Sequence, residues 1–323
     1  VNGTFSCASL VIGVGNGTAT LTFSGVSPQL TVNGSVTLGN SVNDNRKGAI
    51  IFTSGSILIA NSVTNGTNGN NGTITMTAGG TLQTGSLANT TTATWTPGTG
   101  TVIMTATNTL PATVFTSFNN LIVSAGTTTL GVATTISGNV TISSGATLDE
   151  SSRTMTLSSG SILTVNGILD FSSSTGLIRT GNNLAATLTM GTNGLIRTID
   201  ALGLGPVANA SFVNQGTGSW DLSRISNNGT VEYYRSSDNT GIITDRDYNN
   251  LTITSTGTKT WTLGGTRTVN GNLTINSSAP LTLSGTQTIN LKGNWSNSGT
   301  FTSGTSTLTM NGTAAQTMIG STF

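Results

Sequence analysis

The chain contains no histidine, a single cysteine (Cys7), and only 11 basic and 10 acidic side chains in 323 residues. The absence of histidine excludes a histidine general base, a histidine-activated nucleophile and histidine metal ligation. One cysteine excludes an intrachain disulfide and a thiolate zinc site. The net charge of +1 comes without the basic cluster that phosphate binding needs, so we expect no nucleic-acid partner. We also expect no enzymatic activity, no catalytic or metal-binding residues and no cofactor.

Long apolar runs and helix signals are missing as well. No run of about 18 apolar residues occurs, so we expect no membrane span. No apolar stripe with the helical period persists for three turns, and proline is scarce, with 5 residues. Gly, Ser, Thr and Asn instead make up 56% of the chain, and no charged residue lies between Gly48 and Leu148.

Short runs in which apolar residues alternate with small polar ones predict β-strands. Examples are residues 73–77 (TITMT), 139–142 (NVTI) and 251–253 (LTI). The runs end in Asn-Gly, Gly-Asn or Ser-Gly, which supply the positive φ that turns require. Because net charge is near zero and β-branched residues are abundant, the low complexity indicates a folded, all-β chain and not a disordered one.

Two long segments of the chain repeat each other. Residues 118–123 (FNNLIV) match residues 248–253 (YNNLTI), and residues 135–142 (TISGNVTI) match residues 268–275 (TVNGNLTI). A third copy opens the chain as Cys7-Ala8-Ser9-Leu10-Val11-Ile12, followed by residues 30–38 (LTVNGSVTL). The three copies are anchored at Leu10, Leu121 and Leu251. We therefore expect three modules, residues 1–117, 118–247 and 248–323, the last incomplete at its C-terminal end, all stacked as one rod.

Within a module the smaller unit is a strand, an Asn-Gly turn and a strand, about 20–25 residues in all. A unit of this size cannot close its own core and must stack on its neighbours. The pattern predicts a β-solenoid, a right-handed parallel β-helix with irregular turns that number roughly 14. Neutral Thr and Asn suit such stacking, because like charges in register on adjacent turns repel. Tandem β-sandwich domains are the alternative, since strands at 8–12-residue spacing are also present.

The FNNLIV, YNNLTI, TVNGNLTI and NGTAAQTMIG segments resemble the Thr/Asn/Gly-rich repeat proteins secreted by Bacteroidetes-type bacteria. They are more loosely similar to the β-solenoid shafts of filamentous-haemagglutinin-like and autotransporter adhesins. The resemblance covers essentially the whole chain as a style of repeat. It implies a secreted, extracellular or cell-surface bacterial protein with a structural or adhesive role.

One stretch, residues 232–247, is dense in charge. It offers a protomer-contact or glycan patch, or an acid-base pair of the kind that glycosidases use, with flanking aromatics. The alternative is a solvated excursion between turns, with surface ion pairs of little energetic weight. The candidate residues are Glu232, Tyr233, Tyr234, Arg235, Asp238, Asp245, Arg246 and Asp247.

Two carboxylates, the single cysteine and the four tryptophans each admit a functional and a structural interpretation. Asp149 and Glu150 offer carboxylates for calcium, but calcium needs six or more oxygen ligands. Cys7 occupies the position held by Phe118 and Tyr248, which predicts a buried, inert thiol. The four tryptophans can be core residues, caps or platforms for sugar rings: Trp95, Trp220, Trp261 and Trp295.

Thr-x-Thr runs suggest a third function, an ice-binding array. They occur at residues 73–77, 92–96, 105–109 and 258–262. Any Thr-rich β-helix places Thr at alternate outward positions, and these runs do not recur at a constant interval. We therefore rank this reading below the others.

The ends of the chain suggest assembly. Residues 1–43 and 293–323 carry no charge, although proteins normally protect an open strand edge. Either the chain is a segment of a longer repeat protein, or the last turn of one copy is completed by the first turn of the next. The candidate assembly residues are Phe5, Cys7, Leu10, Met318, Ile319 and Phe323. The sequence thus favours a structural fibre unit or adhesin shaft, with a carbohydrate-binding or carbohydrate-active protein as the alternative.

Overall fold

The computed structural model describes residues 1–14, 17–39, 46–67, 72–90, 92–205, 208–238, 240–242, 246–262, 265–286 and 288–320. In these residues the chain forms parallel β-strands and one short 3-10 helix, η1 (Ser223–Ser226). The strands stack into a β-solenoid of about 13 turns, which confirms the predicted fold class. The β-sandwich alternative is wrong, because sandwich sheets pair antiparallel strands. No helix in the described ranges is long and apolar enough to cross a membrane.

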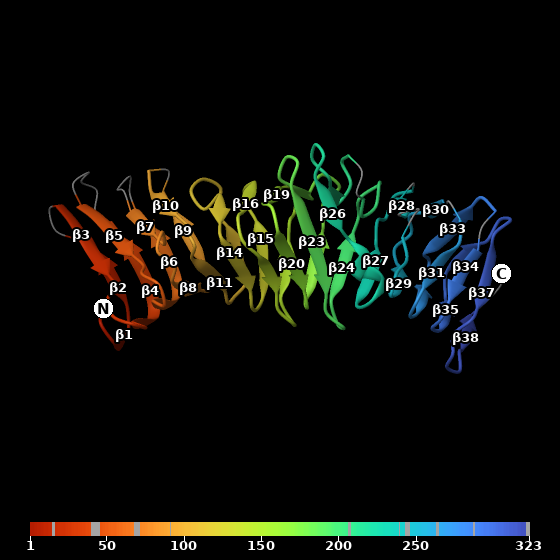
Figure 1. Ribbon diagram of the computed structural model, residues 1–323, viewed down its shortest axis with the longest axis horizontal. Coiled ribbons are helices and arrows are strands. Elements are labelled where there is room, and N and C mark those ends of the chain that lie inside the picture. The colour runs from red at the N-terminus through yellow and green to blue at the C-terminus, as the bar shows by residue number, and fades with distance from the viewer. Residues whose placement is uncertain are drawn as a thin grey trace. The chain divides into compact units, whose positions relative to one another are not determined.

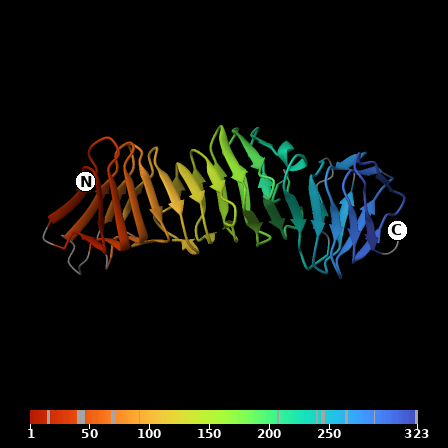
Figure 2. The same cartoon turned by 90° about the horizontal axis from the view of Figure 1, so that it is seen from below.

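The chain divides into two compact units. Figure 1 labels their strands. Unit 1 comprises residues 1–148 and 155–161, and unit 2 comprises residues 149–154 and 162–323. The boundaries of these units differ from those of the three modules expected from the repeats, and the modules stay a prediction. Seen from below, the strands of each unit run side by side along its stack (Figure 2).

Unit 1 is built from four sets of parallel strands. The first set holds, in order, β1 (Thr4–Cys7), β4 (Gln29–Leu38), β6 (Ile57–Asn65), β8 (Thr81–Thr84), β11 (Thr101–Met104), β14 (Asn120–Val123) and β17 (Val140–Ile142), with β2 (Leu10–Ile12) beside β4 and β9 (Leu87–Asn89) beside β6. The second holds β10 (Thr94–Thr96), β7 (Gly72–Thr75), β5 (Arg46–Ile51) and β3 (Gly17–Thr22). The others hold β12 (Asn108–Leu110), β15 (Thr127–Leu130) and β18 (Thr147–Asp149), and β13 (Ser117–Phe118), β16 (Thr134–Ile136) and β19 (Thr154–Leu157).

Unit 2 has five such sets. The longest holds β21 (Ile168–Phe171), β24 (Leu195–Thr198), β27 (Thr230–Tyr233), β29 (Asn250–Ile253), β32 (Leu273–Ile275), β35 (Trp295–Asn297) and β38 (Met318–Gly320). Two short sets hold β20 (Ser161–Val165), β23 (Ala185–Met190) and β26 (Ser219–Asp221), and β22 (Leu177–Thr180) and β25 (Phe212–Val213). The last two hold β28 (Thr240–Ile242), β30 (Lys259–Thr262), β33 (Pro280–Ser284) and β36 (Thr300–Thr302), and β31 (Arg267–Val269), β34 (Thr288–Leu291) and β37 (Thr307–Met310).

The core consists of the inward residues of each strand. In β14, Leu121 and Val123 are buried while Ile122 between them is half-exposed, and β29 repeats the pattern with Leu251 and Ile253. This is the period-2 alternation of a strand with one buried face. Parallel register then places inward residues over one another from turn to turn, so that a continuous apolar column forms.

The sequence repeats make equivalent strand pairings, although β2 and β14 belong to one sheet and β29 belongs to another. Leu121 pairs with Val140, Leu251 with Leu273 and Leu10 with Val36. The residues three positions earlier also agree. Phe118 pairs with Ile136, Tyr248 with Val269 and Cys7 with Val32. The repeated residues therefore set the same pairing register between each anchor strand and the strand of the following turn.

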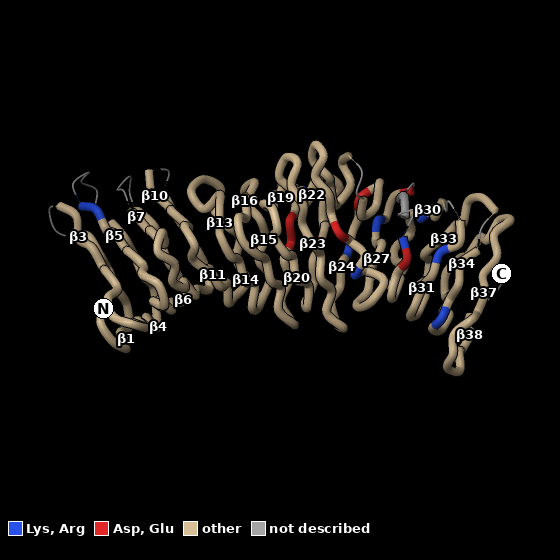
Figure 3. Tube along the Cα trace, viewed as in Figure 1, with Lys and Arg blue, Asp and Glu red and all other residues tan. Residues whose placement is uncertain are grey.

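Charge is distributed unevenly between the units (Figure 3). Apart from Asp44, Arg46 and Lys47, every charged residue of the chain belongs to unit 2. Clusters of charged side chains are therefore found in unit 2.

Candidate functional site

A row of charged side chains crosses three turns of unit 2. Asp170, Arg197 and Glu232 take outward positions on β21, β24 and β27 and lie in register. Arg197 Nη1 lies 3.4 Å from Asp170 Oδ2, and Arg197 Nε lies 2.8 Å from Glu232 Oε2. We call these three residues the charged row. Because one guanidinium faces two carboxylates, the row links the three turns.

Two neighbours complete the charged row. The hydroxyl of Tyr234 donates to Asp170 Oδ1 at 2.6 Å, and the Arg197 guanidinium lies 4.3 Å from the centroid of the Tyr234 ring. The hydroxyl of Thr254 donates to Glu232 Oε1 at 2.8 Å. Burial raises the pKa of Asp170, although the Tyr234 hydrogen bond and Arg197 oppose the shift. Burial and the hydrogen bond to Asp170 raise the pKa of Tyr234.

A carboxyl group is buried near the charged row. Glu150 is fully buried, and neither of its carboxyl oxygens has a hydrogen-bond partner within the described chain. Burial, and then the charges of Asp149, Asp170 and Asp200, raise its pKa from 4.5 to about 10. Glu150 is therefore protonated at neutral pH. A Cβ on Gly176 would overlap Glu150 Oε2, so only glycine leaves room for this carboxyl.

The carboxyl groups of Asp149 and Glu150 do not face a common site. Asp149 Oδ1 accepts hydrogen bonds from Ser172 Oγ at 2.6 Å and from the backbone N–H of Ser151 at 2.8 Å, whereas Glu150 is enclosed in the core. Successive residues of a strand point to opposite faces. In the described ranges no group of three or more Asp, Glu, His or Cys side chains is arranged to hold a metal ion. The calcium reading of this pair has no support in the geometry.

The structure disperses the residues of the 232–247 stretch. Glu232 and Tyr233 lie in strand β27 and not in an excursion, and Tyr233 is fully buried. Its hydroxyl lies 2.9 Å from that of Tyr248, which is also buried. Tyr233 therefore cannot belong to a surface patch. The prediction was wrong here because the inward position in the Thr230–Tyr233 alternation was read as part of the loop.

The remaining residues of the stretch have separate contacts. Arg235 Nη1 donates to the carbonyl of Ile199 at 2.7 Å, and the exposed Asp238 accepts from the backbone N–H of Thr258 at 2.7 Å. Arg246 and Asp247 line a hollow of about 260 Å³ with Ser223, Ser226 and Arg267. Asp245 lies outside the described residues.

The assembly candidates lie on strands at the ends of their sets. Phe5 in β1 is 54% exposed, and Met318 and Ile319 in β38 are 50% and 63% exposed. Leu10 is half-buried, and Phe323 lies outside the described residues. Cys7 is half-buried and carries a free thiol. The prediction of a buried Cys7 is wrong, because β1 pairs on one side with β4 and no strand covers its other side in the described chain.

Three of the four tryptophans are core residues: Trp220, Trp261 and Trp295. Trp95 is half-buried, and its indole N–H donates to the carbonyl of Ser117 at 2.6 Å. Two of the Thr-x-Thr runs meet in register, since Thr73 pairs with Thr94 and Thr75 with Thr96. On the next turn these columns continue with Ala49 and Ile51, so the threonine array is interrupted.

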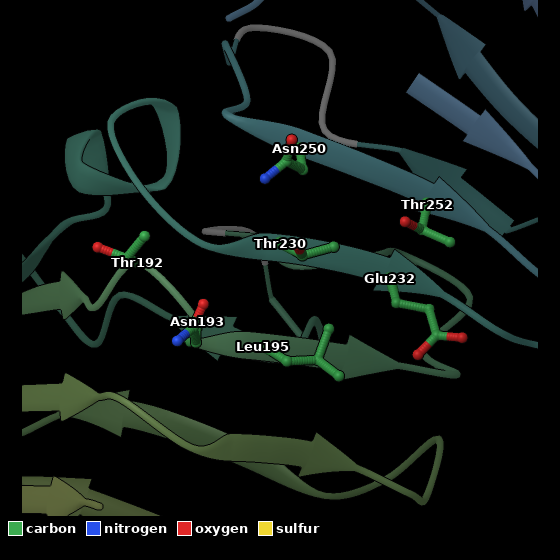
Figure 4. A pocket seen from close by; sticks show the side chains of 8 residues that line it. Thr192, Asn193, Leu195, Thr230, Glu232, Asn250 and Thr252 are labelled. Atoms are coloured by element: carbon green, nitrogen blue, oxygen red, sulfur yellow. The ribbon is translucent and has the colours of Figure 1, made fainter. Parts of the chain in front are cut away.

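The outer face of unit 2 is hollowed over β24, β27 and β29 (Figure 4). The groove has a volume of about 510 Å³ and is lined by Thr192, Asn193, Gly194, Leu195, Thr230, Glu232, Asn250 and Thr252. Among these residues, Glu232 alone was predictable as a site residue from the sequence. The others are ordinary Thr, Asn, Gly and Leu residues that the strand register and the turn at Thr192 and Asn193 bring together.

The Asn-Asn pair of the repeat links three successive turns. Its first residue, Asn249, donates through Nδ2 to the carbonyl of Gly229 on the preceding turn at 3.0 Å. Its second residue, Asn250, accepts at Oδ1 from the backbone N–H of Asn272 on the following turn at 2.9 Å. Asn119 and Asn120 make the equivalent contacts to Gly100 at 3.4 Å and Asn139 at 2.9 Å.

The contact continues beyond the repeat. Asn272 Oδ1 accepts from the backbone N–H of Asn294 at 2.8 Å, and Asn294 Oδ1 accepts from that of Thr317 at 2.8 Å. We call Asn250, Asn272 and Asn294 the amide ladder. It gives the repeated asparagines a role in joining turns.

Comparison with known proteins adds no relative. The chain matches no protein-family model, no curated protein and no solved structure.

Proposed function

We propose that this chain is a non-enzymatic structural protein, a β-solenoid shaft of a surface fibre or adhesin. The observation that carries the proposal is the amide ladder. Asn250 and Asn272 of the repeat, and Asn294 beyond it, accept hydrogen bonds between turns at 2.8–2.9 Å. Repeated residues of a binding or catalytic surface would instead present their polar atoms to solvent.

The charged row supports the same role. Arg197 faces both Asp170 and Glu232, and Tyr234 and Thr254 occupy further lone pairs of the two carboxylates. A glycosidase needs one carboxyl group that can donate a proton to a substrate and a second that can attack or activate water. Here the carboxylates are directed at protein groups, which favours cross-linking of turns over acid-base chemistry.

We place the shaft outside the cell, as a bacterial secreted or surface protein. This part of the proposal rests on the resemblance to secreted Thr/Asn/Gly-rich repeat proteins. The strands β1 and β38 each have an edge that no described strand covers, with Phe5, Met318 and Ile319 exposed beside it. An uncovered parallel edge accepts a further strand, supplied either by a second copy or by further turns of the same protein.

The experiment is analytical ultracentrifugation with electron microscopy of the purified chain over a range of micromolar concentrations. We expect elongated end-to-end species that grow with concentration. Ile319→Lys should abolish them, because a lysine on an edge strand blocks pairing. Leu202→Lys is the matched control, since Leu202 is 48% exposed but lies in a turn. Monomers alone at every concentration would contradict end-to-end assembly, and turnover of a polysaccharide would contradict the non-enzymatic role.

A further inference from the structure

The groove over β24, β27 and β29 has a chemistry that stacking does not explain. Its floor consists of outward side chains from three adjacent strands, and its rim is the turn at Thr192 and Asn193 (Figure 4). The volume of about 510 Å³ falls within the range of small-molecule sites. We propose that this groove binds a short segment of a neutral oligosaccharide, a function beyond the structural one.

The polar groups of the groove divide into two kinds. Asn250 is committed to the amide ladder through Oδ1 and to the Gly229 carbonyl through Nδ2. The hydroxyls of Thr192, Thr230 and Thr252 and the amide of Asn193 have no hydrogen-bond partner in the described chain. Hydroxyl and amide groups both donate and accept. Sugar hydroxyls have the same dual character, so the lining and a sugar complement each other.

Glu232 supplies a fixed acceptor at one side of the groove. Arg197 Nε holds its Oε2 at 2.8 Å, and the Thr254 hydroxyl holds its Oε1 at 2.8 Å. Each carboxylate oxygen has two lone pairs, so each can accept one more hydrogen bond. Because the orientation is already set, a sugar hydroxyl that donates to Glu232 has little side-chain entropy to overcome. Leu195 adds an apolar surface on the floor, against which the C–H face of a pyranose can pack.

Other ligand classes fit the groove less well. An extended peptide that binds by β-augmentation adds a strand to a free edge, but β24, β27 and β29 are paired on both sides within their sheet. An anionic ligand would face the Glu232 carboxylate, and no basic side chain lines the groove. These features select a ligand that is uncharged, rich in hydroxyls and recognised by side chains.

The test uses saturation-transfer NMR and calorimetry with the trisaccharides of cellulose, amylose, laminarin, mannan and chitin, and with trigalacturonate as the anionic probe. We expect a Kd on the order of 1 mM or tighter for at least one neutral probe. Thr230→Tyr fills the groove from an outward strand position and should weaken binding by at least about tenfold. Thr282→Tyr, at an outward position of β33 away from the groove, should leave binding unchanged.

Asn193→Ala provides a second variant that leaves the strands intact, because Asn193 is an exposed turn residue. It should also weaken binding. The proposal is overturned if no neutral probe binds at about 10 mM, if trigalacturonate binds more tightly than every neutral probe, or if binding survives both Thr230→Tyr and Asn193→Ala.

Discussion

The backbone N–H of Asn272 donates to the side-chain oxygen of Asn250 at 2.9 Å, across one full turn of the chain. The contact recurs between Asn272 and Asn294, and between Asn120 and Asn139. At the point where the chain enters the next strand, the backbone N–H therefore donates to a side-chain amide oxygen and not to a backbone carbonyl. A repeated side chain of the sequence thus joins one turn of the stack to the next.

Asn272→Ala should destabilise unit 2. The substitution removes the acceptor of the Asn294 N–H, and the loss of a typical hydrogen bond costs about 0.5–1.5 kcal/mol in the free energy of unfolding. Denaturant unfolding followed by circular dichroism measures the loss. Asn276→Ala is the control, because Asn276 is equally exposed but its side chain makes no hydrogen bond in the described chain, so stability should change by less than about 0.5 kcal/mol. Equal effects of the two substitutions would remove the amide ladder from the account.

Gly271→Ala should destabilise the same turn for a steric reason. A Cβ at Gly271 would overlap Asn250 Oδ1 and would lie 3.1 Å from the carbonyl oxygen of Asn249. The cost should shrink in the Asn250→Ala background, where the overlapping amide is gone. A double-mutant cycle measures this coupling, which we expect to be about 0.5–3 kcal/mol. Additive effects of the two substitutions would show that Gly271 and Asn250 are not energetically coupled.

Glu150→Leu should stabilise the protein at pH 7. The substitution exchanges a buried carboxyl without hydrogen-bond partners for an apolar side chain, which removes a polar desolvation penalty of about 1–3 kcal/mol. Asp238→Asn is the control, because Asp238 is exposed and its replacement should change the melting temperature little. A lower melting temperature for Glu150→Leu would mean that the carboxyl has a partner that stabilises it.

The wild-type chain should lose stability as pH rises from about 4.5 to 7.5. The pKa of Glu150 is about 10 in the folded state against 4.5 as its ordinary value, and that of Asp200 is about 6 against 3.8, both because of burial. The folded state therefore binds more protons than the unfolded state in this window, and stability falls with pH by at most about 1.4 kcal/mol per unit for one group. Glu150→Gln should flatten the profile. An unchanged slope of stability against pH in this variant would show that groups other than Glu150 cause the pH dependence.

Lys259→Met should be strongly destabilising. The buried Lys259 ammonium donates to the carbonyls of Arg235 at 2.7 Å, Thr254 at 2.5 Å and Ser255 at 2.9 Å. Burial lowers its pKa to about 8, so it remains mostly charged at pH 7. Met leaves three carbonyls without that donor, at a cost of about 3 kcal/mol or more. Lys292→Met is the control, since Lys292 Nζ has a single exposed contact, with Asn270. A similar loss of stability in both variants would contradict the stabilising role of the three hydrogen bonds from Lys259.

The register of the anchor turns was predictable from sequence, whereas the charged row was not. The anchors Leu10, Leu121 and Leu251 share an alternating pattern and a flanking Asn-Gly or Gly-Asn turn, so their alignment follows from local rules. Asp170, Arg197 and Glu232 are separated by 27 and 35 residues in two turns of unequal length. Their meeting depends on the turn lengths, which the local pattern does not specify.

Glu150 and Tyr233 show two different limits of the pattern. Tyr233 follows the alternation of Thr230–Tyr233, and its inward position could have been read from Val231 two residues earlier. Glu150 breaks the pattern, because an unpaired carboxyl is almost never enclosed in a core. The groove lies at a third limit, since its Thr and Asn residues are indistinguishable by type from the rest of the outward surface.

The most direct test of the account measures amide hydrogen exchange at Asn272, Asn294 and Thr317 in the Asn250→Ala variant. The amide ladder predicts that Asn272 alone loses protection, by about tenfold for a hydrogen bond of about 1.4 kcal/mol, while Asn294 and Thr317 retain their partners. Unchanged protection at Asn272 would contradict the claim that the repeated asparagines join one turn to the next.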